Sequence, residues 1–321
     1  MTRKVLLSAL SAVIISAFFI PVSQQKSILI KSSFLNTYSF LNNPVKWEHW
    51  RPELRKTIET DSNKISVQTE KDAFRIKDEN FEIKIKASGN FFDINERRDA
   101  KSINYTYALI PVDDKFLNKT IISSGQKISV ISYLTGLAWP TVNSDNHLSE
   151  LKNFMETDSL LYGFNIIKTA VPESNLIVMR KEVKNQDKFT EAGKMQSALR
   201  EYVKVNHLKQ VYPVIAQYLP NGADSTQVNV GFYIDKEVPS ANGIIFTRMP
   251  KGGPLLAAAY KGQFSKRGKA YSALKQYFSN HAYQAALLPF ETYLDNKLPG
   301  NDNDVINIEV NFPTFPNGKT K

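Results

Sequence analysis

Ten residues that occur twice decide the fold of the C-terminal half. The stretch GKMQSALREY at Gly193–Tyr202 recurs as GKAYSALKQY at Gly268–Tyr277, 75 residues further on. In both copies apolar residues follow the i, i+3, i+4, i+7, i+8 spacing of an amphipathic helix. These positions hold Met195, Ala198, Leu199, Tyr202 and Val203 in the first copy, and Ala270, Ala273, Leu274, Tyr277 and Phe278 in the second. The repeat therefore predicts two equivalent helices.

Strands are expected on both sides of each repeated helix. A strand precedes each one, at Leu176–Arg180 and at Leu255–Tyr260, and the closing strands alternate apolar and polar residues. The apolar positions are Val228, Val230, Phe232 and Ile234 in the first copy, and Ile306, Ile308, Val310 and Phe312 in the second. Two β-α-β-β halves predict one antiparallel sheet with both helices on the same face.

Composition excludes several classes of protein. The chain has 321 residues, a length typical of two domains, and it contains no cysteine and only four histidines. No two histidines have the close spacing of a metal site, so we expect no metal, no cofactor and no Ser-His-Asp catalysis. The net charge of +10 is spread over both halves, and no helix-turn-helix is evident. Nucleic acid is therefore not a predicted partner.

The first 25 residues are typical of a membrane anchor. Arg3 and Lys4 precede an uncharged run from Val5 to Val22, which as a helix would span roughly 27 Å. The positive charges predict a single-pass protein with a cytoplasmic N-terminus and extracytoplasmic domains. The alternatives are a cleaved signal peptide on an exported soluble protein, and a buried core helix.

Residues 26–161 form the first predicted domain. A strand at Ser27–Lys31 and a short helix at Phe34–Leu41 come first, followed by Trp47 and Trp50. Period-two strands come next, with apolar positions at Phe81, Ile83 and Ile85 and at Ile103, Tyr105, Tyr107 and Leu109, before a strand near Lys127–Tyr133. An apolar face then predicts a final helix over Ser144–Leu161, closed by Gly163. The order is that of a helix-grip domain.

This opening resembles the START-like (polyketide cyclase/dehydrase, SRPBCC) superfamily. The residues that carry the resemblance are Ser27–Lys31 and the stretch FLNTYSFLNNPVKWEHW at Phe34–Trp50. The resemblance implies a hydrophobic cavity between the sheet and the long helix, for lipids, hormones or polyketides, in a superfamily of which only some members are enzymes. Read from the residues alone, Trp47 and Trp50 are expected to pack in the core or to anchor at the membrane interface.

The second domain, residues 163–321, resembles the GyrI-like small-molecule-binding domain, also known as an effector-binding domain. The match rests on PKGGPLLAAAYKGQF at Pro250–Phe264, on the helix Ala270–Tyr277 and on PFETY at Pro289–Tyr293. The resemblance implies that Glu291 lies at the floor of a ligand pocket. With the first domain it predicts an α+β protein made of a membrane helix, a START-like domain and a duplicated GyrI-like domain.

Strand alternation places Leu288, Phe290, Thr292 and Leu294 on one face, which as the apolar face we expect the helices to cover. Pro289, Glu291 and Tyr293 lie on the other face, so we expect Glu291 on the open, concave side of the sheet. The equivalent residue of the first copy is Ala216. A carboxylate among aromatic rings suits a lipophilic cation. The predicted ligand-binding residues are Glu291, Tyr293, Tyr260, Tyr218 and Tyr233. In the alternative, Glu291 pairs with a lysine on a solvated face.

A basic run lies just before the second repeated helix. It consists of Lys261, Lys266, Arg267 and Lys269. We expect these residues on a solvated or headgroup-facing surface rather than in a phosphate site.

The favoured function is a membrane-tethered, non-enzymatic protein that binds lipophilic or cationic small molecules, with no catalytic residue assigned. The alternative is a hydrolase of electrophilic small molecules in which Glu291 acts as general base. A third class, a protein-binding regulator resembling gyrase inhibitors, is disfavoured by the predicted exterior location.

Overall fold

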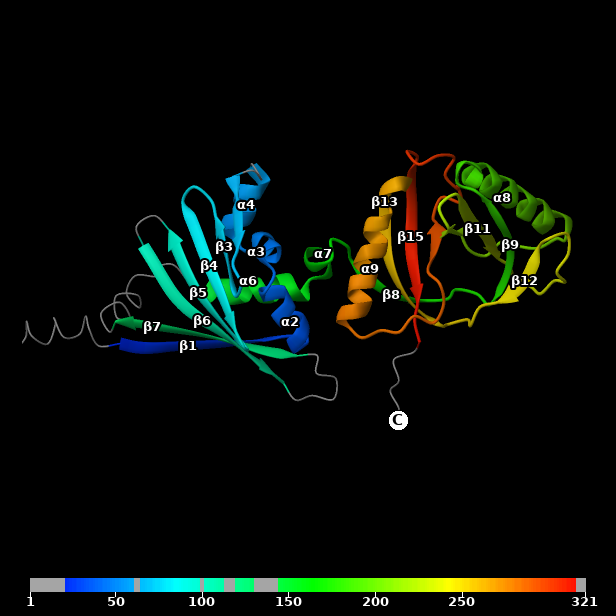
Figure 1. Cartoon of the computed structure of the whole chain (residues 1–321). Helices are drawn as coiled ribbons and strands as arrows, with labels where there is room; N and C mark the ends of the chain where they lie inside the picture. The colour runs from blue at the N-terminus through cyan, green and yellow to red at the C-terminus, as the bar shows by residue number, and fades with distance from the viewer. Residues whose placement is uncertain (1–20, 61–63, 99–100, 113–118, 130–143, 316–321) are drawn as a thin grey trace, which may run out of the picture. The chain divides into compact units, whose positions relative to one another are not determined.

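The computed structural model describes residues 21–60, 64–98, 101–112, 119–129 and 144–315, which form two compact units divided between residues 157 and 158 (Figure 1). Each unit combines helices with one antiparallel sheet, so the predicted α+β class is confirmed. Within these ranges no helix has the length and hydropathy to cross a bilayer. Residues 1–20 of the predicted anchor lie outside the described part. Residues 21–25 at its end belong to the strand Pro21–Ile30, so the predicted end of the anchor is wrong.

Unit 1 is built on a seven-stranded sheet. Its strands are β1 (Pro21–Ile30), β2 (Ser66–Thr69), β3 (Ala73–Lys77), β4 (Phe81–Ser88), β5 (Phe91–Arg98), β6 (Lys101–Pro111) and β7 (Thr120–Ser129). They are ordered β1-β7-β6-β5-β4-β3-β2, and every pairing is antiparallel. Alternate residues of β4 and β6 are buried, as the period-two pattern predicted, and β5 shows the same alternation.

The described residues of unit 1 include four helices: α2 (Phe34–Leu41), α3 (Pro44–Trp50), α4 (Pro52–Thr60) and α6 (Ser144–Glu156). Ser33 caps α2 through its side chain, and Asn43 caps α3, which has Pro44 in its first turn. Trp47 and Trp50 of α3 are buried, and their ring centroids lie 5.1 Å apart. The prediction that they pack in the core is confirmed.

The helix predicted over residues 144–161 is interrupted. It ends as α6 at Glu156, and a separate short helix, α7 (Asp158–Leu161), begins unit 2. The Glu156 carboxylate accepts a hydrogen bond from the Lys31 backbone N–H at 2.8 Å, which fixes the end of α6 next to the end of β1. The apolar periodicity of residues 144–161 continues across the break at residue 157, so the sequence pattern does not predict that the helix ends there.

Unit 2 contains an eight-stranded sheet. Its strands are β8 (Ile166–Ala170), β9 (Asn175–Lys184), β10 (Ile215–Asn221), β11 (Ser225–Tyr233), β12 (Ile245–Arg248), β13 (Pro254–Gln263), β14 (Phe290–Tyr293) and β15 (Val305–Pro313). The order is β12-β9-β11-β10-β14-β15-β13-β8. The two copies of the repeat meet at β10 and β14, where Ala216 pairs with its equivalent, Glu291. The sequence did not predict the edge strands β8 and β12.

The repeated helices are α8 (Lys188–Val205) and α9 (Gly268–Asn280), each preceded by a 3-10 turn, η2 (Asn185–Asp187) and η3 (Phe264–Lys266). Helix α8 contacts β9 and β11, and α9 contacts β13 and β15. Their buried residues share one hydrophobic core, so the prediction of two helices on the same face is confirmed. One detail was wrong: Ala198 is exposed, and Gln196 is buried instead because its amide donates to the Asn296 carbonyl at 2.8 Å.

The opposite face of this sheet carries a second, smaller apolar cluster. Its buried members are Val171, Leu176, Val178, Ile215, Tyr233, Leu255 and Phe290. No repeated helix covers this face, because both helices pack on the other side.

Candidate functional site: a buried carboxylate beside α9

Glu291 lies on the helix-covered face of the unit 2 sheet. Its side chain is fully buried, and its strand neighbour Tyr293 belongs to the core that α8 and α9 share. The predicted open, concave face is therefore wrong. The prediction assigned Leu288 and Leu294 to the covered side, but these residues flank the short strand β14 and are 62% and 39% exposed.

Three donors explain why a carboxylate is stable in this core. Oε1 of Glu291 accepts from Arg267 Nε at 2.6 Å and from the Tyr271 hydroxyl at 2.9 Å, and Oε2 accepts from the Tyr293 hydroxyl at 2.5 Å. Hydrogen bonds with a charged partner are short and strong, and they offset the cost of removing the carboxylate from water. Glu291 is thus paired, with an arginine inside the fold rather than with a surface lysine.

Arg267 follows η3 and is held over an aromatic ring. The centre of its guanidinium lies 3.5 Å from the ring centroid of Phe264 and 5.7 Å from that of Tyr218, which are cation–π distances. Its side chain keeps 19% exposure. The prediction of a solvated surface is correct for the three lysines of the basic run, Lys261, Lys266 and Lys269, but wrong for Arg267, because Glu291 and Phe264 hold its charge.

Tyrosines around Glu291 stay protonated at neutral pH. Burial, and then the negative charge of Glu291, raise the pKa of Tyr271 far above its usual range. The same two causes raise the pKa of Tyr218 and Tyr293. These side chains therefore act as aromatic surfaces and neutral hydroxyl groups, and the charge balance of the site rests on Glu291 and Arg267.

The internal repeat provides a comparison for this ion pair. Phe264 aligns with Phe189 at the same offset of 75 residues, and the two rings meet with centroids 5.0 Å apart. Glu291 aligns with Ala216, and Arg267 aligns with Ala192, both alanines being buried. One copy therefore carries both charged residues and the other carries neither.

The structure brings only some of the predicted binding residues together. Tyr293 donates to Glu291, and the Tyr218 ring lies beside the Arg267 guanidinium. Tyr260 is partly buried against the same core, but its hydroxyl donates to the Gln263 carbonyl at 2.7 Å. Tyr233 lies on the opposite face of the sheet, where its ring packs against Tyr212.

The geometry does not favour the hydrolase alternative. A general base must reach a proton of its substrate or of a water molecule. Both oxygens of Glu291 accept hydrogen bonds from the protein, and the side chain has no exposed surface.

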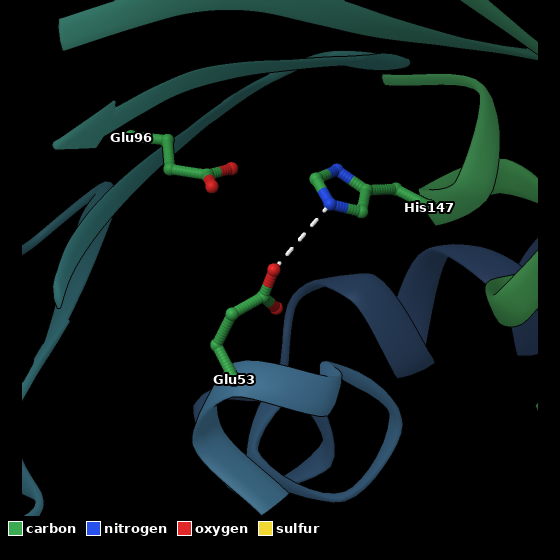
Figure 2. Close-up of side chains that lie close together, drawn as sticks. All are labelled: Glu53, Glu96 and His147. Carbon is green, nitrogen blue, oxygen red and sulfur yellow. Dashed lines mark ion pairs between the residues drawn. The ribbon is translucent and has the colours of Figure 1, made fainter. Parts of the chain in front are cut away.

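Unit 1 contains a buried ionic cluster that the sequence did not predict. Glu53 of α4, Glu96 of β5 and His147 of α6 point toward one another (Figure 2), and their polar atoms lie within 4.8 Å of one another. Imidazole and carboxylate groups are common metal ligands, so these three side chains are a candidate metal site.

Arg51 makes the cluster unsuitable for a metal ion. Its guanidinium, itself fully buried, donates to Glu96 Oε2 at 2.8 Å and lies 3.0 Å from His147 Nδ1. Because an arginine can only donate, Nδ1 is the acceptor, and the proton of a neutral ring sits on Nε2, which lies 3.6 Å from Glu53 Oε1. The imidazole then has no free lone pair for a cation, and the centre of the cluster already holds a positive charge.

The cluster ties the helices of unit 1 to its sheet. The Tyr105 hydroxyl of β6 also donates to Glu96, at 3.1 Å. Although burial opposes it, the facing imidazole of His147 and the charge of Arg51 lower the pKa of Glu53 far below its usual value of 4.5. One sequence signal was available, because Glu96 occupies the next inward position after Phe92 and Ile94 of β5.

No protein-family model and no curated protein sequence matches this chain. Among solved structures, the C-terminal domain of EcmrR is similar over 47% of this chain and 97% of its own, with a TM-score of 0.39 and 19% identity. A hydrolase from Listeria innocua is similar over 47% and 91% of the two chains, with a TM-score of 0.34 and 10% identity. The di-domain ARO/CYC BexL from the BE-7585A biosynthetic pathway is similar over 91% and 85%, with a TM-score of 0.33 and 10% identity. These are partial similarities of fold, so function must be argued from the residues of this chain.

Proposed function

We propose that this chain is a non-enzymatic small-molecule-binding protein whose unit 2 binds lipophilic cations, at the position that the Arg267 guanidinium occupies. The observation that carries the proposal is a fully buried carboxylate, Glu291, whose positive partner is stacked 3.5 Å from the centroid of the Phe264 ring. A carboxylate, an aromatic face and two tyrosine hydroxyl groups are the recognition elements of a flat, delocalised cation.

Exchange of one cation for another is the step that this arrangement allows. Arg267 stands between η3 and α9 with 19% of its side chain exposed, so its guanidinium can rotate into water without breaking a helix. Glu291 cannot follow it, and a buried unpaired carboxylate is costly. An incoming cation that restores the pair is therefore favoured over an empty site.

Affinity in such an exchange comes from the apolar part of the ligand. The number of ion pairs stays constant, because a ligand cation replaces a protein cation. The net gain is the burial of ligand surface against Phe189, Phe264 and Tyr218, whose rings form one cluster. A cation that carries an aromatic substituent should thus bind better than guanidinium itself.

The test uses benzylguanidinium and its neutral analogue benzylurea in calorimetric titrations. Arg267→Ala should bind the cation at least about tenfold more tightly than the urea, and Glu291→Gln in that background should remove the difference. The wild-type protein should bind the cation more weakly than Arg267→Ala, because Arg267 must first leave. Absence of cation binding to the wild type up to millimolar concentration would sink the proposal and leave Arg267 and Glu291 as a structural pair.

We further propose that residues 5–20 tether the protein to a membrane, directly before strand β1, with both units on the extracytoplasmic side. The uncharged run after Arg3 and Lys4 supports this. The alternative, a cleaved signal peptide, gives the same compartment without the tether.

A further inference from the structure

The face of the unit 2 sheet that the repeated helices leave uncovered contains a groove of about 380 Å³. Strands β9, β10 and β11 form its floor, and the segments Thr247–Met249 and Leu287–Leu288 lie at its sides. This groove is separated from Glu291 by the thickness of the sheet. It lies within the size range of small-molecule sites, about 300–1,000 Å³.

One end of the groove is apolar. Leu176, Val178, Ile215 and Phe290 line it and are each no more than 8% exposed. The adjacent Leu288 is 62% exposed. A second hollow, of about 460 Å³, adjoins the first and shares Met249 and Leu287 with it. Hydrocarbon laid along this path would cover leucine side chains that are now in water.

The other end is polar and already ordered. Asn229 Nδ2 donates to Gln217 Oε1 at 2.8 Å, and Gln227 Nε2 donates to Asn229 Oδ1 at 3.2 Å. Gln217 Nε2 donates in turn to the Pro289 carbonyl at 2.9 Å. These amides hydrogen-bond to one another and to the backbone, which fixes the shape of this end of the groove. Because amides are neutral, any charge at this end comes from other residues.

Arg180 supplies that charge. It lies on β9 at the polar end, it is exposed, and it forms no ion pair with any residue that the structure describes. Glu182, on the same face of β9, accepts a hydrogen bond from Ser225 at 2.8 Å. The second guanidinium at the groove, that of Arg248, is bound to Glu237. The apolar groove thus ends at a guanidinium, that of Arg180, which no carboxylate of the described residues pairs with.

We propose that this groove binds an amphipathic carboxylate, such as a medium-chain fatty acid. The carboxylate would lie on Arg180, whose planar fork matches two carboxylate oxygens. The tail would lie over Leu176, Val178, Ile215 and Phe290 and point toward the second hollow. This site is independent of the cation site proposed beside α9, since it uses the other face of the sheet and a charge of opposite sign.

The test compares three probes of equal chain length by calorimetry below their micellar concentrations: decanoate, decanol and decyltrimethylammonium. Wild-type protein should bind decanoate in a saturable manner and bind the other two at least about tenfold more weakly. Arg180→Gln should reduce the decanoate affinity to that of decanol. Lys181→Gln is the matched control, because it removes the same charge from a neighbour that pairs with Glu191 beside α8.

Three results would overturn the proposal: no saturable decanoate binding, equal binding of decyltrimethylammonium, or equal loss of affinity in Arg180→Gln and Lys181→Gln. Leu288→Ser, at an exposed position, should weaken decanoate and decanol alike, and no effect on either would remove the tail from this groove. Failure of benzylguanidinium to bind would contradict only the cation site on the helix-covered face, and failure of decanoate to bind would contradict only the groove. The two proposals can therefore be refuted separately.

Discussion

A double-mutant cycle on Arg267 and Glu291 is the most informative test of the unit 2 core. Arg267→Ala leaves a fully buried carboxylate without its cation, and removing one partner of a buried pair costs about 3–5 kcal/mol. Glu291→Ala leaves the hydroxyl groups of Tyr271 and Tyr293 without their acceptor, at about 1–3 kcal/mol for each buried group.

The double variant should cost much less than the sum of the two single changes. It reproduces the state of the other repeat copy, where Ala192 and Ala216 are both buried in the same fold. We expect a coupling free energy of about 2–3 kcal/mol, because the double variant contains neither charged side chain and so leaves no buried charge without its partner.

Urea unfolding can follow the two units separately. All three tryptophans, Trp47, Trp50 and Trp139, precede residue 158, so their fluorescence reports unit 1. Far-UV circular dichroism reports both units. The variants should lower the urea midpoint of unit 2, which is detected by dichroism but not by fluorescence. The midpoint of unit 1, detected by fluorescence, should stay unchanged. Additive costs in the cycle would refute the reasoning, since they would mean that the two side chains do not depend on each other.

Three further predictions concern other parts of the chain. Because folding lowers the pKa of Glu53 despite its burial, through His147 and Arg51, its charge stabilises unit 1 above the usual value of 4.5. Glu53→Gln should thus lower the fluorescence-detected stability at pH 7, with a difference that shrinks as the pH falls below 4.5; a difference independent of pH would contradict this. Gly231→Ala should destabilise unit 2 by about 1 kcal/mol, because the added Cβ would lie 3.2–3.3 Å from atoms of Ile215, Ile177 and Leu176. Gly193→Ala, in α8 with open space around it, should instead stabilise unit 2 by about 0.5–1 kcal/mol. If urea unfolding showed Gly193→Ala to be less stable than Gly231→Ala, the packing argument would be wrong. The full chain should sediment with membranes and resist carbonate washing, whereas a chain starting at Pro21, which keeps all of β1, should stay in the supernatant; a shortened soluble form recovered from cells would favour a cleaved signal peptide.

Local patterns in the sequence predicted most of the secondary structure. The helix at Phe34–Leu41 was placed at its observed bounds, and the closing strands of both copies were found from their alternation. Such patterns repeat within a few residues and report which side of an element is apolar. They did not find β8 or β12, which are held by pairing to the sheet edges at β13 and β9.

The candidate site was predicted in part. Glu291 stood out as an acid in a strand among aromatic residues, but its partner lies 24 positions earlier and looked like one more residue of a basic run. The buried cluster of unit 1 joins Arg51, Glu96 and His147, which are up to 96 positions apart. Strand alternation could mark the inward position of Glu96, but it could not identify the partners, because burial of a charge depends on a partner that the fold supplies.

The sequence by itself determined that unit 2 is a duplicated β-α-β-β domain with both helices on one face, because the repeat and its apolar periods are local and recur 75 residues apart. Tertiary structure alone decided which face Glu291 occupies. Alternation separates the two sides of a strand but does not say which side the helices cover, and the apolar residues flanking β14 indicated the wrong one. Glu291 lies inside because Arg267, Tyr271 and Tyr293 converge on it there, and their hydrogen bonds make the covered side the one where its charge is stable.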